Sequence, residues 1–171
     1  MHRFSRLFAL GGIVLVFSAN AFAGDLGITP KQFEKRFNSF LADLKEETNT
    51  ALLKRINVKV DSGAVKDTFL VCPAKNTCII GGVDKKTGKV VDVTINGRPE
   101  GTDTSVLTIL SNMVVGSSAA IPVAKNFNST NKSVLKLVNQ ETDIVGYGDY
   151  RMSFGISKEL GMLLLTVEKS E

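Results

Sequence analysis

The chain has 171 residues, with 21 lysines and arginines, 17 aspartates and glutamates, and one histidine, His2. Basic and acidic residues are interspersed, which favours a solvated surface of mixed charge over a nucleic-acid-binding patch. The shortage of histidine argues against the acid-base catalysis and transition-metal binding that imidazole supports at neutral pH.

The first 23 residues have the pattern of a secretory signal peptide. Two arginines precede an apolar segment at residues 7–17, and Ala21-Phe22-Ala23 is an A-x-A cleavage site. The apolar segment is shorter than the roughly 20 residues of a spanning helix, so we expect no stable membrane span in the mature chain. We expect cleavage after Ala23, a single domain over residues 24–171, and a location in the periplasm or outside the cell.

A helix is predicted to begin at Pro30. Thr29 is placed to act as N-cap and Gln32 to complete a capping box. Apolar residues then recur at helical spacing, at Phe33, Phe37, Phe40, Leu41 and Leu44. We expect this stripe to pack in the core. The alternative is that its three phenylalanines form a partner-binding face.

Alternating apolar residues predict four strands, over residues 56–60, 65–72, 78–84 and 89–95. The pair Gly81-Gly82 inside the third strand indicates a bulge or a close approach by another backbone. Cys72 and Cys78, the only cysteines, flank the turn between the second and third strands. In an oxidising compartment they should form an intramolecular disulfide, and their spacing is not the C-x-x-C of redox enzymes.

The stretch between Asp103 and Lys125 carries no charge and predicts a deeply buried helix, with a membrane-inserting helix as the alternative. A further short helix is expected over residues 133–138, followed by strands over 150–156 and 162–168. The predicted fold is α+β: an N-terminal helix, a four-strand antiparallel meander, two helices, and a C-terminal β-hairpin that completes the sheet.

No motif in the chain makes a convincing catalytic centre. Ser129 and Lys132 match S-x-x-K, and residues 86–88 match K-T-G, as in penicillin-binding proteins, but the two motifs occur in the wrong order. The carboxylates are dispersed, and no calcium-binding loop is present. We therefore expect no enzymatic activity, no cofactor and no metal.

The best candidate for a binding site is the segment from Gly146 to Tyr150. It places Tyr147, Asp149 and Tyr150 beside two glycines, and tyrosine on a turn supplies contact area and a hydroxyl at low entropic cost. Tyr147 is the preferred anchor because no regular element is expected around it. The alternative is a simple turn followed by a strand in which Tyr150 packs on the sheet.

These features favour a non-catalytic binding protein that acts through another periplasmic or cell-envelope protein, as an inhibitor, an immunity protein or an assembly accessory. One alternative is a carrier or sensor of an apolar small ligand held between the phenylalanine stripe and the uncharged helix. A third is a small hydrolase that uses Ser and Lys or carboxylates.

Overall fold

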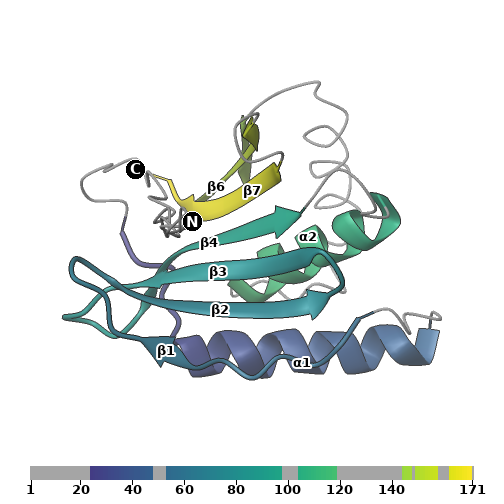
Figure 1. Cartoon of the computed structure of the whole chain (residues 1–171), viewed down its shortest axis with the longest axis horizontal. Coiled ribbons are helices and arrows are strands. Elements are labelled where there is room, and N and C mark those ends of the chain that lie inside the picture. The colour runs from purple at the N-terminus through teal and green to yellow at the C-terminus, as the bar shows by residue number, and fades with distance from the viewer. Residues whose placement is uncertain are drawn as a thin grey trace, which may run out of the picture.

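The computed structural model describes residues 24–47, 53–97, 104–118, 144–147, 149–157 and 162–170. Within them lie two helices and a seven-stranded antiparallel sheet with strand order β1-β2-β3-β4-β7-β6-β5 (Figure 1). The elements are α1 (Pro30–Glu47), β1 (Val60–Asp61), β2 (Asp67–Ala74), β3 (Thr77–Val83), β4 (Val90–Gly97), α2 (Thr104–Ser118), β5 (Ile144–Tyr147), β6 (Tyr150–Ser157) and β7 (Met162–Lys169). The expected α+β class is confirmed. The expected signal peptide and the helix expected over residues 133–138 lie outside the described residues.

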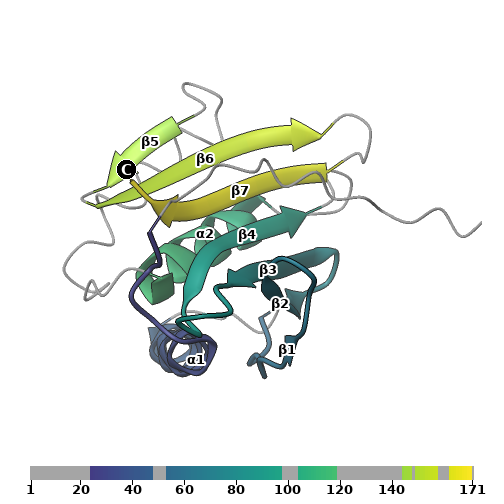
Figure 2. The ribbon, with the colours of Figure 1, turned by 90° about the vertical axis from the view of Figure 1, so that its left-hand side faces the viewer.

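Both helices lie on the same face of the sheet, with α1 beneath the β1 to β3 half and α2 against β4 and β7 (Figure 2). Strand residues facing the helices are buried, such as Ile95 of β4 and Leu165 of β7, which are paired across the two strands. Residues that alternate with them, such as Asp92 and Glu168, lie on the opposite face and remain partly exposed. The described residues thus form two layers with one core between them.

The phenylalanine stripe of α1 belongs to this core. Phe33 and Phe37 are fully buried, and the ring centroid of Phe33 lies 6.1 Å from that of Phe37 and 5.6 Å from that of Phe69 on β2. Phe40 is partly buried and packs against the same cluster. The core interpretation of the stripe is therefore confirmed.

The start of α1 has the predicted capping box. The Thr29 N–H donates to Gln32 Oε1 at 2.8 Å, and the Gln32 N–H donates to Thr29 Oγ1 at 3.2 Å. Two amides that the helix itself leaves without partners are satisfied in this way.

The prediction of a strand over residues 56–60 is wrong for residues 56–59, because regular strand pairing in this region begins only at Val60, in β1. Residues 53–59, here called the strap, instead bond to α1. The Asn38 side-chain amide donates to Ile56 O and accepts from Ile56 N–H, both at 2.9 Å, and Val58 N–H donates to Glu34 Oε2 at 2.9 Å. These side chains satisfy backbone N–H and C=O groups that would otherwise be available for hydrogen bonds to a neighbouring strand.

Glu34 makes the attachment of the strap dependent on pH. The hydrogen bond from Lys31, 2.6 Å away, and then that from the Val58 N–H hold the pKa of Glu34 below its usual range. A lowered native-state pKa contributes stability above the unfolded-state pKa, and this contribution is lost as pH falls through the native value.

We expect the free energy of unfolding to fall between about pH 5 and about pH 3, and Glu34→Gln to flatten this part of the curve. Urea denaturation at several pH values measures it. Asp43→Asn, which alters an exposed carboxylate of the same helix, is the control. An unchanged slope in Glu34→Gln would contradict the assignment.

The two glycines of β3 make room for the side chains of Phe69 on β2 and of Lys66, which directly precedes β2. A Cβ on Gly81 would lie 2.1 Å from the ring of Phe69, and one on Gly82 would lie 2.7 Å from Lys66 Nζ. The register also shifts between Gly82 and Val83. The predicted bulge is present, but side chains rather than a second backbone make the close approach.

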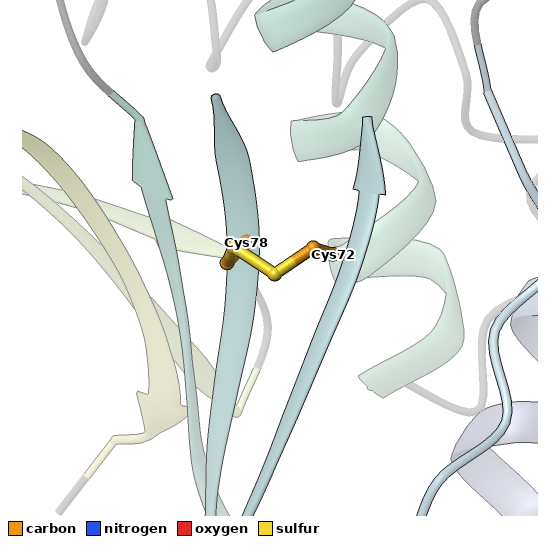
Figure 3. Close-up of a disulfide and its surroundings, with 2 residues drawn as sticks. All are labelled: Cys72 and Cys78. Carbon is orange, nitrogen blue, oxygen red and sulfur yellow. A yellow bond between two sulfur atoms is a disulfide. The ribbon is translucent and has the colours of Figure 1, made fainter. Parts of the chain in front are cut away.

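The predicted disulfide joins Cys72 and Cys78 across β2 and β3, with their Cα atoms 4.0 Å apart (Figure 3). It lies beside the turn at residues 75–76, where Asn76 adopts a positive φ of 61°. Asparagine tolerates this left-handed conformation better than most residues. The disulfide therefore ties together the two strands that this turn connects.

Candidate protein-binding site

The structure corrects the reason for choosing Tyr147 as a binding anchor. Tyr147 is the last residue of β5 and pairs with Tyr150, the first residue of β6, so it belongs to a regular element after all. Its side chain lies outside the described residues, and its binding role remains a prediction. Tyr150 is half-buried and packs against the core, while Asp149 is exposed and its carbonyl accepts a hydrogen bond from Ser170 N–H at 2.8 Å.

Exposed apolar side chains point to a different part of the molecule. Within the described residues, the large hydrophobic side chains that stand out into solvent are Val65, 92% exposed, Leu70, 59% exposed, and Val60, 45% exposed. All three come from residues 60–70, here called the 60–70 hairpin, which contains β1, the connecting turn and the start of β2. Val60 pairs with the buried Phe69 and therefore lies on the helix side of the sheet, whereas Leu70, the next residue of β2, lies on the opposite face. Val65, the most exposed of the three, is the candidate contact residue.

Asp67 organises the turn of this hairpin, residues 62–66, here called the Val65 loop. Its carboxylate oxygen Oδ1 accepts hydrogen bonds from Ser62 Oγ at 3.3 Å and from Gly63 N–H at 3.2 Å. The same oxygen lies 3.6 Å from Lys85 Nζ in the β3–β4 turn. Asp67 thus ties the start of the loop to the β3–β4 turn.

Lys66 fixes the other end of the Val65 loop. Its side chain crosses β3 above Gly82 and forms an ion pair with Asp92 on β4. Gly63 completes the arrangement, because a Cβ at this position would lie only 2.1 Å from the Lys66 carbonyl oxygen. The loop is therefore tight and attached at both ends, and Val65 projects from its tip.

The chemistry of this loop suits recognition. An aliphatic side chain held out by a constrained turn can enter an apolar pocket of a partner with little loss of conformational entropy. The sequence predicts a strand that begins at Val65, whereas β2 begins at Asp67 and Val65 lies in the preceding turn. The available signal was the turn sequence Asp61-Ser62-Gly63 followed closely by Asp67, whose carboxylate can accept hydrogen bonds from the N–H groups of the turn.

Comparisons with known proteins found no matching family model and no significant similarity to a curated protein or to a solved structure. Among the described residues, no group of three or more His, Cys, Asp or Glu side chains is arranged to hold a metal ion. Neither helix in the described part of the chain combines the length and the apolar character needed to cross a membrane.

Proposed function

We propose that this is an exported, non-catalytic binding protein that acts through a protein partner in the periplasm or cell envelope. The observation that carries the proposal is the exposure of Val65 on a loop constrained by Asp67 and Lys66. Buried aliphatic and aromatic anchors supply most of the affinity in protein interfaces, and a preorganised anchor binds with a smaller entropic cost. Export is supported by the signal-peptide pattern of residues 1–23 and by the disulfide.

The partner's site should be apolar at its centre. Lys66 is already paired with Asp92, and Asp67 with Lys85, so the charged groups beside Val65 are neutralised within the chain. A partner that offered a single charge there would have to compete with these pairs. An apolar pocket of aliphatic size complements Val65 better.

Substitution of Val65 tests the proposal. The tagged protein is recovered from the periplasm, where N-terminal sequencing should begin at Gly24, and is then used to capture partners from periplasmic extract. We expect Val65→Asp to reduce capture of a specific protein at least tenfold, because it places a charge in an apolar pocket. The melting temperature should stay within about 2 °C of the wild type, since surface substitutions change stability by about 0.5 kcal/mol or less.

Ala42→Asp is the matched control, since it makes the same kind of change at an exposed position of α1. A protein captured by the wild type and by Ala42→Asp but not by Val65→Asp supports the proposal. Equal capture by all three proteins, or the absence of any specific partner, contradicts it. Recovery of the chain only with residues 1–23 attached in the membrane fraction contradicts the export part.

Neither alternative function is favoured by a specific observation. For a carrier of apolar ligands, the phenylalanine stripe would have to line the binding site, yet Phe33 and Phe37 are packed against each other, and Phe33 also packs on Phe69. For a hydrolase, the K-T-G sequence at residues 86–88 would have to lie on a strand. It lies in and just after the β3–β4 turn, where the N–H groups of Lys86 and Thr87 donate to Asp84.

A further inference from the structure

The disulfide lies on the open face of the sheet, which is the face opposite the helices. Val71, which precedes Cys72, and Ile79, which follows Cys78, are buried on the helix side, so the two cysteine side chains project from the other side. Cys72 is exposed and Cys78 is half-buried. Figure 3 shows the bond bridging β2 and β3. Thiol–disulfide exchange requires that a thiolate reach one of the two sulfur atoms, and Cys72 is the more accessible of the two.

The strands beside the disulfide are held together by their own pairing. Val71 pairs with Ile79 on one side of the bond, and Ala74 pairs with Thr77 on the other. The two cysteines are only six positions apart, and closing so short a loop removes little entropy from the unfolded chain. We therefore expect the β2–β3 hairpin to keep its fold when the bond is reduced. The two thiols then stay side by side, ready to form the bond again.

Apolar side chains adjoin the disulfide on the open face. Leu70, two residues before Cys72, is 59% exposed. Ile80, two residues after Cys78, pairs with Leu70 and is half-buried. The facing positions of β4 are also uncharged, namely Thr94 and Asn96. Leu70, Ile80 and the two cysteines are here called the disulfide face, an accessible S–S bond beside an apolar contact surface.

We infer that the disulfide face is a site of thiol–disulfide exchange with a partner protein that carries a dithiol and an apolar surface around its attacking thiol. A thiolate of the partner attacks Cys72 Sγ and forms a mixed disulfide. The Cys72–Cys78 bond breaks with its electron pair on Cys78 Sγ, which takes up a proton. The partner's second thiolate then attacks the partner's first sulfur and releases Cys72, which is protonated in turn.

The exchange transfers two electrons, so the chain ends with two thiols and the partner with a disulfide. Because the cysteines lack C-x-x-C spacing, the chain is the substrate of this exchange and the partner is the oxidoreductase. An exposed disulfide is more labile than a buried structural one, which suits this role. The inference does not depend on the proposed partner site, because Val65 is not part of the disulfide face.

Reduction of the native protein by dithiothreitol measures access to the bond. Samples are alkylated at intervals and their free thiols are counted by mass spectrometry. We expect a rate proportional to dithiothreitol concentration and within about tenfold of the rate for the chain unfolded in urea. A native rate about a hundredfold or more below that of the unfolded chain would show that reduction waits for unfolding. That result would overturn the inference.

A thioredoxin-type protein tests recognition by a protein dithiol. With its second cysteine replaced by serine, it should form a mixed disulfide that survives acid quenching, and mass spectrometry should locate the attachment at Cys72. Leu70→Asn should slow reduction by the intact C-x-x-C protein about tenfold, because it removes an apolar contact. The same variant should react with dithiothreitol like the wild type, which needs no such contact.

Val65→Asn is the matched control, since it makes the same kind of change at an exposed position outside the disulfide face. It should be reduced by the thioredoxin-type protein at the wild-type rate. Attachment at Cys78 would overturn the inference. Equal rates for Leu70→Asn and Val65→Asn with the protein dithiol would also overturn it.

Discussion

Phe37→Ala is expected to lower the free energy of unfolding by about 3–5 kcal/mol, the largest effect anticipated for a single substitution in this protein. Phe37 is fully buried in the middle of α1, and its ring centroid lies 6.1 Å from that of Phe33, which in turn packs on Phe69 of β2. Its removal leaves a cavity between the helix and the sheet in addition to the lost transfer free energy. Urea denaturation followed by circular dichroism measures the change.

Phe40→Ala provides the comparison within the same stripe. Phe40 is only partly buried, so its truncation removes less contact with the core and should cost clearly less stability than Phe37→Ala. Equal losses for the two variants would show that burial does not rank these positions. An unchanged stability in Phe37→Ala together with loss of partner capture would instead make the stripe an interface.

Gly81→Ala is expected to cost about 3 kcal/mol, because the added methyl group would lie 2.1 Å from the ring of the buried Phe69. The ring cannot move away freely, since its other contacts include Phe33. Thermal and urea denaturation both measure the loss. Gly155→Ala, a change on β6 with no atom within 4 Å of the new group, should stay within about 0.5 kcal/mol of the wild type.

A double substitution tests the stated cause. If the clash with the ring is responsible, Phe69→Leu should relieve part of it, and the double variant with Gly81→Ala should be more stable than the sum of the two single losses predicts. Additive losses would show that Gly81 matters for another reason, such as the backbone conformation of β3.

Several features of this chain were readable from short stretches of sequence. The capping box of Thr29 and Gln32 and the disulfide of Cys72 and Cys78 each involve residues close in the chain, so their chemistry is decided locally. The amphipathic stripe of α1 and the strands of the β3–β4 hairpin follow from periodicity, since each has one face toward the core. The α+β class follows from the order of these elements.

The strap shows why alternation alone is insufficient. Residues 56–60 have the pattern of a strand, but Asn38, 18 residues earlier, takes both the N–H and the carbonyl of Ile56. Whether a backbone group bonds to a neighbouring strand or to a helix side chain depends on what folding brings beside it. Strand β5 was missed for the related reason that four residues including a glycine give no periodic signal, and pairing with β6 defines them as a strand.

The candidate site depended most on tertiary structure. The sequence by itself showed that His2 is the only histidine, and it predicted that the two cysteines pair and that a turn follows Val60. Only the fold decided that Val65 projects from that turn while its neighbours Lys66 and Asp67 bond to Asp92 and Lys85. The physical reason is that exposure is set by how much of a side chain other elements cover, and those elements come from distant parts of the chain.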